Sequence, residues 1–376
     1  MMKFSTLMRK PADWMQGQGG DSSIVLSSRI RLARNINEYA FPGWAAKDDR
    51  VHVLHDLKST LEALPEMKDA FSADLQNLTS IEKQVLVERH LISREHAAKS
   101  NGSAAIVNRK QSLSIMVNEE DHLRMQAIRP GLRLREAYEL LDKVDTDLET
   151  EVVYAFDNTL GYLTACPTNL GTGLRASVML HLPALVLSEQ INQVIQAVNK
   201  IGFAVRGLYG EGTEALANLF QVSNQTTLGD KELEIVARLE KIVQQIIQHE
   251  ENARAKLGEE KRTTLNDQIG RAFAILKYSH IISSKEALNL LSMIRLGCDL
   301  GYFPPENGGL ANLLLMEIQP AHLQIEAKRK LSAEERDALR AEITRRKLRN
   351  LPEPGHPAAS GDGDGGDHDP INWNDE

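Results

Sequence analysis

The order of apolar and polar residues predicts β-strands in the first part of the chain. Apolar and polar side chains alternate between residues 24 and 34, which is the period-two pattern of a strand. In such a strand Arg29 and Arg31 point to the same face. Other apolar runs predict strands at residues 84–91, 103–107, 113–118, 178–180, 203–208 and 220–227.

Apolar residues spaced three and four apart predict helices between and after these strands. The spacing covers residues 46–72, 133–148 and 188–201, and then nearly all of 229–350. Two later helices have N-terminal capping boxes, Ser283 with Glu286 and Ser332 with Glu335. The pattern therefore predicts an α+β first part followed by an all-α second part.

Composition narrows the class of protein. A hydrophobic content of 42% and a charged content of 26% are ordinary for a soluble globular protein. The net charge of −8 argues against a general affinity for nucleic acid or anionic membranes. Two cysteines, Cys166 and Cys298, and no signal-peptide core after the first residues predict a reducing, cytoplasmic compartment. The longest apolar stretch, residues 178–187, is too short to span a bilayer.

One central stretch, residues 166–177, concentrates unusual chemistry. It reads CPTNLGTGLRAS, with a thiol, a proline, two glycines and an arginine between apolar runs. Gly171 and Gly173 would let the backbone approach a ligand closely, and Arg175 offers a fork of donors suited to phosphate oxygens. The stretch also fits a loose dinucleotide fingerprint, G-x-G-x-x-A, although that motif should join a strand directly to a helix. An ordinary glycine turn is the remaining interpretation.

Three segments, in this order, resemble the phosphagen kinases, the ATP:guanidino phosphotransferases. Residues 27–31 read SSRIR, residues 117–124 read VNEEDHLR, and CPTNLGTGLRAS is the signature of that family. An acidic run is more often a solvated loop, but this one follows an apolar strand and precedes an arginine. The resemblance implies a glutamine synthetase-like catalytic domain, in which helices flank an antiparallel sheet.

The resemblance also assigns roles to individual residues. It implies that Glu120 and Glu211 are catalytic carboxylates and that Cys166 lies near the guanidinium substrate as a thiolate, although a small buried residue is an equal alternative for the cysteine. Arginines of the motifs would hold ATP, with Mg²⁺ bridging its phosphates, and no protein metal site is expected. A lone histidine is more often structural, but the surroundings of His90 resemble those of a nucleotide-contacting histidine in the family. The nucleotide-binding residues expected in this way are Ser27, Ser28, Arg29, Ile30, Arg31, His90, Arg124, Arg175, Ala176, Ser177, Val178, Met179, Arg206, Gly207, Leu208, Tyr209, Gly210 and Glu211.

The C-terminal helices distinguish branches of this family. Kinases of free creatine or arginine carry a small helical domain ahead of the catalytic domain, whereas here the SSRIR segment begins at residue 27. Together with residues 209–215, YGEGTEA, this arrangement resembles the branch that phosphorylates arginine side chains of proteins. That branch has an R-D-x-x-R-A motif that binds phosphoarginine allosterically, and the matching residues are Arg336, Asp337, Arg340 and Ala341. A charged helix face is the plainer interpretation of that motif.

The resemblance further implies partners. Substrates would be proteins with exposed arginines, marked for the Clp protease machinery in protein quality control and the stress response. A zinc-binding activator of the McsA type and a homodimer are also implied. Two alternatives are a kinase for free arginine or another small guanidino compound, and a non-catalytic phosphoarginine-binding adaptor, against which the complete set of arginines and carboxylates argues.

The expected domain organisation has four parts. They are a flexible N-terminus at 1–20, the catalytic domain at 21–257, a helical phosphoarginine-binding domain at 258–350 and a disordered acidic Gly/Asp-rich tail at 351–376. The tail aspartates lack the spacing of a calcium-binding loop.

Overall fold

The computed structural model describes residues 2–16, 23–207, 215–305 and 307–355 of the 376-residue chain. Within them, the strands of the main sheet lie in the order β2-β3-β4-β5-β1-β8-β10-β9, and each neighbouring pair is antiparallel. These strands are β1 Val25–Arg34, β2 Phe71–Asp74, β3 Ala104–Val107, β4 Leu113–Val117, β5 Leu123–Pro130, β8 Leu174–His181, β9 Phe203–Gly207 and β10 Leu219–Asn224. A separate hairpin pairs β6, Phe156–Asp157, with β7, Gly161–Tyr162.

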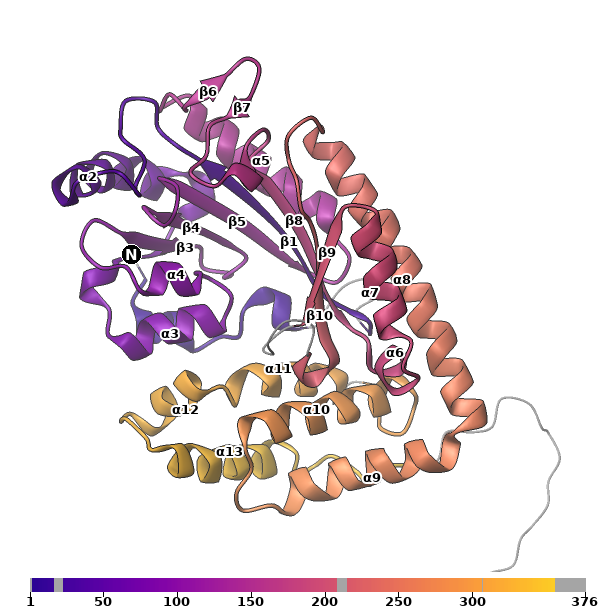
Figure 1. Ribbon diagram of the computed structural model, residues 1–376. Helices are drawn as coiled ribbons and strands as arrows, with labels where there is room; N and C mark the ends of the chain where they lie inside the picture. Colours follow the sequence, from indigo (N-terminus) through magenta and orange to yellow (C-terminus); the bar gives the residue numbers. More distant parts are fainter. Residues whose placement is uncertain (1, 17–22, 208–214, 306, 356–376) are drawn as a thin grey trace, which may run out of the picture.

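Helices cover one face of this sheet (Figure 1). Apolar side chains of this face, such as Ile30, Leu32 and Val178, form one core with the helices. The long helix α8 packs against β8 and β10 and then continues toward the C-terminal helices (Figure 1). The covering helices are α2 Lys47–Ala63, α5 Leu134–Glu149, α7 Ile191–Lys200 and α8 Glu232–Glu260.

The C-terminal helices form a second apolar core below the sheet (Figure 1). That core also includes Leu26, Met179 and Leu219 from the ends of three strands, so the helical part is joined directly to the sheet. Its helices are α9 Arg262–Tyr278, α10 Ser284–Asp299, α11 Asn307–Glu317, α12 Pro320–Ala327 and α13 Ala333–Lys347. The α+β class, with an antiparallel sheet flanked by helices and followed by helices alone, is confirmed.

A buried cluster of hydrogen bonds joins the two parts. His322 at the start of α12 bonds through Nδ1 to a carboxylate oxygen of Glu88 at 2.8 Å, and that carboxylate also accepts from the backbone N–H of Ala321 and His322. Glu88 lies at the end of α3, Ser80–Glu88, and α4, Arg94–Ala97, follows it.

The remaining described elements are short. They are α1 Phe4–Met8, α6 Pro183–Leu187, and the 3₁₀ turns η1 Asp13–Gln16, η2 Pro65–Met67, η3 Leu75–Asn77, η4 Pro167–Asn169 and η5 Leu216–Asn218.

Two local predictions are wrong. Residues 84–91 were expected to form a strand, but most of them lie in helix α3, where Thr79 and Glu82 form a capping box that outweighs the preference of two valines for strands. The N-terminus was expected to be flexible, yet residues 2–16 contain α1 and η1, and Leu7 and Trp14 are buried. Burial of these large apolar side chains stabilises the segment against the sheet.

Candidate active site

Arginines from four strands lie on the face of the sheet that the covering helices leave open. The register places Arg31 of β1 opposite Arg175 of β8, and Arg29 opposite Ser177. On the other side of β1, Arg31 lies opposite Gln126 of β5, and Arg124 points to the same face two residues earlier. Side chains at paired positions point to the same face, so antiparallel pairing brings together residues that are far apart in sequence.

Burial and mutual repulsion make this arginine face electrostatically strained. Burial, and then Arg124 and Arg175, lower the pKa of Arg29 to about 10. Burial and the neighbouring arginines lower the pKa of Arg31 well below its ordinary value. The Nε atoms of Arg31 and Arg175 are buried and have no hydrogen-bond partner among the described residues. Unpaired donors and concentrated positive charge fit a polyanion such as a triphosphate.

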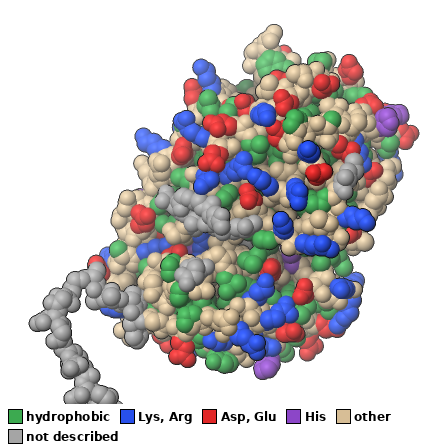
Figure 2. Space-filling view, turned by 180° about the vertical axis from the view of Figure 1, so that it is seen from behind, with side chains coloured by type: hydrophobic (Ala, Val, Ile, Leu, Met, Phe, Trp, Pro, Cys, Tyr) green, Lys and Arg blue, Asp and Glu red, His purple; other side chains and the backbone are tan. Residues whose placement is uncertain are grey.

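Positive charge is thus local in a protein of net charge −8. Figure 2 shows Lys and Arg side chains gathered across the middle of one side of the molecule. Arg206 of β9 is exposed, and its charge contributes to lowering the pKa of Arg175, after the larger effect of burial. The fifth expected arginine therefore lies beside the others, at the edge of the sheet.

His90 lies beside this face, at the end of α3. It adopts a left-handed backbone conformation with φ of 58°, and Gln126 Nε2 donates to its carbonyl at 2.6 Å. Burial, then Arg29 and Arg94, lower the pKa of His90 to about 3, so its ring is neutral at physiological pH. His90 lines a pocket together with Ser27, Arg29, Ser177 and Met179, which are all among the residues expected to bind the nucleotide. Trp14, Ile128 and Gln221 complete the lining.

Some expected nucleotide-binding residues point away from this pocket. Ser28 and Ile30 lie on the opposite face of β1, where Ser28 Oγ donates to the Gly131 carbonyl at 2.8 Å and Ile30 is fully buried. Ala176 and Val178 also belong to the core under the covering helices. Only backbone groups of these four residues remain for a ligand. Gly207 ends β9, and Leu208, Tyr209, Gly210 and Glu211 lie outside the described residues.

The acidic loop after β4 places three carboxylates in different environments. Glu119 is buried and binds Arg124 Nη1 through both oxygens, at 2.8 and 2.7 Å, and Ser93 Oγ also donates to it. Burial opposes its ionisation, but Arg124 and Ser93 outweigh burial and lower its pKa. Glu119, which sequence reasoning did not single out, therefore orients a predicted phosphate-binding arginine.

Glu120 is the exposed carboxylate of the loop. Partial burial, and then the charges of Asp121 and Glu119, raise its pKa above the ordinary value. A raised pKa makes the ionised group a better proton acceptor. Glu120 is thus free of the ion pair that holds Glu119, and it lies near the arginine face.

Asp121 joins the acidic loop to the central stretch. Its Oδ1 accepts from the Ala165 N–H and from Asn35 Nδ2, both at 2.7 Å. Cys166, which follows Ala165, is partly buried, and its Sγ lies 3.1 Å from Thr168 Oγ1. It also interacts electrostatically with Arg175. The structure therefore brings Cys166 to the arginine face, beside the acidic loop.

The two glycines of the central stretch serve the chain's own packing rather than a ligand. Gly173 has φ of +65°, and a Cβ there would lie 2.6 Å from the Ala33 carbonyl oxygen. Gly171 has φ of +108°, and a Cβ would lie 2.6 Å from the Thr227 carbonyl oxygen. A strand rather than a helix follows them, which excludes the dinucleotide fingerprint.

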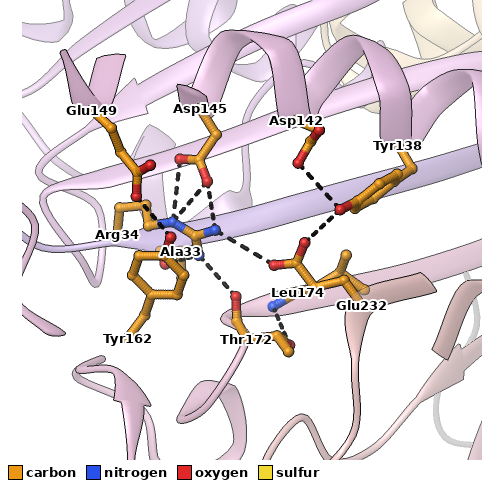
Figure 3. Close-up of polar contacts among 10 residues, drawn as sticks. All are labelled: Ala33, Arg34, Tyr138, Asp142, Asp145, Glu149, Tyr162, Thr172, Leu174 and Glu232. Carbon is orange, nitrogen blue, oxygen red and sulfur yellow. Dashed lines mark hydrogen bonds and ion pairs between the residues drawn. The ribbon is translucent and has the colours of Figure 1, made fainter. Parts of the chain in front are cut away.

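Arg34, the third arginine of β1, supports this stretch from the covered face of the sheet (Figure 3). Its guanidinium bonds to Asp145 of α5 at 2.6 Å and donates from Nη1 to the Thr172 carbonyl at 2.8 Å. It also stacks on the Tyr162 ring, with Cζ 3.5 Å from the ring centroid. Glu232 of α8 lies 3.6 Å from Nη2. The sequence analysis did not single out Arg34. Its position in β1, an odd number of residues from Arg29 and Arg31, places its side chain on the opposite, covered face.

The candidate phosphoarginine residues lie on α13, far from this face in sequence. Ser332 caps α13 with a capping box, as predicted. Arg340 is buried, donates to the carbonyls of Ile318 and Ile282 at 3.1 and 2.9 Å, and pairs with Asp337. Arg336 is half-buried and donates to the Leu331 carbonyl, and Ala341 is buried.

Among the residues that the structure describes, no group of three or more His, Cys, Asp or Glu side chains is placed to hold a metal ion. No helix within the described ranges has the length and apolar character needed to cross a membrane.

The fold agrees with that of the family whose catalytic domain the chain matches. Residues 52–253 match the ATP:guanido phosphotransferase C-terminal catalytic domain. Among solved structures, lombricine kinase is 26% identical, with a TM-score of 0.56 over 64% of this chain and 70% of that chain. The chain belongs to the ATP:guanido phosphotransferase family and is a phosphotransferase. A taurocyamine kinase from Schistosoma mansoni, 22% identical with a TM-score of 0.55 over 77% of this chain and 50% of that chain, shares the fold.

The C-terminal helices and the curated relatives define the branch. Residues 262–359 match the C-terminal domain of protein-arginine kinase McsB. The protein-arginine kinase of Brevibacillus brevis is 46% identical over 351 residues, or 93% of this chain and 98% of that protein. That of Geobacillus thermodenitrificans is 48% identical over 339 residues, or 89% and 93%. Within the family, the chain belongs to the protein-arginine kinases.

Proposed function

We propose that this chain transfers the γ-phosphate of ATP to arginine side chains of proteins. The observation that carries the proposal is the arginine face. Arg31 and Arg175 have buried donors without a partner among the described residues, and the exposed carboxylate of Glu120 lies nearby. Phosphoryl transfer depends on positioning and on neutralising charge more than on covalent chemistry. Arginines supply the second, through charge-assisted and often bidentate hydrogen bonds.

The acceptor explains the need for carboxylates. A guanidinium has a pKa of about 12.5–13.8 and is not nucleophilic at neutral pH. Glu120 would align one of its nitrogens with the γ-phosphate and take a proton as transfer proceeds. Glu211 would be the second carboxylate by family motif, and Cys166 would contact the guanidinium. Mg²⁺ would be held mainly by phosphate oxygens and water, as it usually is with nucleotides.

Protein arginines are the favoured substrates because of the relatives and the C-terminal domain. The curated proteins that match nearly the whole chain are named protein-arginine kinases. A kinase for free guanidino compounds is the second candidate, favoured by the structural likeness to lombricine kinase.

Regulation and partners complete the proposal. Phosphorylated proteins would be marked for the Clp protease machinery in the cytoplasm, with an activator of the McsA type and a homodimer as further partners. Phosphoarginine would be sensed at α13 by the R-D-x-x-R-A motif. Arg336 is the more accessible arginine there, since Arg340 would have to leave two carbonyls and Asp337 to bind a phosphate.

The test is a comparison of acceptors. Purified protein is incubated with ATP and Mg²⁺ and either free arginine or an unfolded arginine-rich protein, and acid-labile phosphate is located by mass spectrometry. We expect phosphoarginine in the protein. Phosphate on free arginine alone would favour the second candidate, and no transfer to either acceptor would contradict both.

A further inference from the structure

The N-terminal segment contributes a side chain to the nucleotide pocket. Trp14 lies in η1 and is only 6% exposed. It packs in a small apolar cluster with Met15, Ile128 of β5 and Met316 of α11. The indole is therefore held between the sheet and the C-terminal helices rather than lying loose on the surface.

Trp14 and His90 bring two aromatic rings together in this pocket. Their ring centroids are 5.4 Å apart with the planes at 65°, and both side chains line the pocket that Arg29 and Ser177 also line. A second, largely apolar cavity adjoins it and shares Trp14 and Met179 with it. The pocket thus combines the guanidinium of Arg29 with aromatic and apolar side chains.

This lining suits the base of a nucleotide. A triphosphate held by Arg31 and Arg175 would leave the base to occupy the neighbouring pocket, which Arg29, His90 and Trp14 line. Purines have apolar faces and a rim of hydrogen-bonding nitrogens, so a site for one combines stacking surface with a few polar groups.

The indole N–H of Trp14 is a polar group of this pocket. The Nε1 donor of Trp14 is buried and has no hydrogen-bond partner among the described residues. A buried indole N–H normally has a partner, because leaving it unpaired is costly.

We propose that the Trp14 Nε1–H donates a hydrogen bond to a ring nitrogen of the bound purine, which makes Trp14 a base-recognising residue of the kinase. The proposal rests on the proposed function, because it takes the arginine face as the triphosphate site. It adds the base end of the site and assigns it to a segment outside the family's catalytic-domain match, which begins at residue 52.

The test combines one variant with changes in single atoms of the nucleotide. Trp14→Phe keeps an aromatic ring and removes the donor. Loss of one such hydrogen bond should weaken ATP binding about two- to tenfold, whereas inorganic triphosphate, which has no base, should bind to the variant and the parent alike. Three ATP analogues have one ring nitrogen, at position 1, 3 or 7, replaced by C–H. One of them should bind the parent as weakly as ATP binds Trp14→Phe. That analogue should bind Trp14→Phe no more weakly than it binds the parent.

Controls separate this outcome from a packing defect. Trp44→Phe, at a residue 92% exposed, should change nothing. Trp14→Phe should lower the melting temperature somewhat, because the smaller ring leaves part of the packed cluster unfilled, so triphosphate binding serves as the check that the site is intact. Equal ATP affinity in parent and Trp14→Phe, or equal losses for ATP and triphosphate, would overturn the proposal, as would parent affinities unaffected by every analogue. Failure of the proposed function is distinct, because Arg175→Ala would then leave triphosphate binding unchanged.

Discussion

Arg34 offers the sharpest test of how the sheet supports the site. Its side chain is only 1% exposed and contacts Asp145, Glu232, Tyr162 and the Thr172 carbonyl (Figure 3). Arg34→Met keeps an unbranched apolar stem of similar reach but removes every donor. Asp145, with a side chain 9% exposed, is then left as a buried carboxylate without its cation.

The expected loss of stability follows from that orphaned charge. Removing one partner of a buried ion pair costs about 3–5 kcal/mol. At about 2–4 °C per kcal/mol, the melting temperature should fall by roughly 6–20 °C. Urea unfolding and thermal melting, followed by circular dichroism, measure both quantities. Below the melting temperature, release of Thr172 should also loosen the stretch before Arg175, so kcat/KM for phosphotransfer should fall.

A second variant identifies the cause. Arg34→Met combined with Asp145→Asn removes the unpaired charge and should recover part of the lost stability, although neither the ion pair nor the contact to Thr172 returns. A loss below about 1 kcal/mol in Arg34→Met, as for an exposed pair, would refute the structural role of Arg34. A double variant no more stable than Arg34→Met would show that the unpaired carboxylate is not the source of the loss.

Three further predictions concern catalysis and regulation. Glu120→Gln should keep ATP binding and lose most phosphotransfer, because an amide accepts no proton; near-parent turnover of the variant would contradict this role. In the parent, protonation of Glu120 removes the base, and burial and Asp121 raise its pKa, so a rate–pH profile should show the rate falling at a pH above the ordinary glutamate range. Arg175→Ala should weaken ATP binding and turnover together, by tenfold or more if one charge-assisted contact of about 1.5–3 kcal/mol is lost, and calorimetric titration showing unchanged affinity would place Arg175 outside the site. Arg340→Ala should lower the melting temperature because its two carbonyl contacts are lost, whereas Arg336→Ala should abolish only the response to added phosphoarginine; a response retained when both are replaced would contradict sensing at α13.

Local sequence patterns predicted the strands that carry the motifs but not what lies between them. The alternation in β1 placed Arg29 and Arg31 on one face, as the register confirms. The same alternation places Ser28 and Ile30 on the opposite face. Assigning a whole motif to the nucleotide site ignores this difference between its residues. Which strands would pair, and that Arg175 would lie opposite Arg31, depends on long-range contacts that no local pattern contains.

Other residues gave little or no signal in the sequence. Trp14 belongs to no motif and precedes a glycine-rich run, so only the packing against β5 and α11 reveals it. Residues 84–89 include apolar and β-branched side chains that suit a strand. The capping box at Thr79 favours the helix that forms instead. Glu119 could have been found, because a carboxylate five residues before Arg124 at the turn between adjacent strands can reach across the ladder.

The crowding of cations on one sheet face ties the folded state of this protein to its surroundings. Without an anion, Arg29, Arg31 and Arg175 repel one another in a partly desolvated layer, so the empty protein carries a built-in electrostatic stress. A ligand that neutralises the layer binds the native state alone and stabilises it by RT ln(1 + [L]/Kd), about 2.7 kcal/mol at a hundredfold excess over Kd. The nucleotide pool of the cell would then help to keep this enzyme folded. Depletion of ATP would lower the stability of the enzyme at the same time as it removes the substrate.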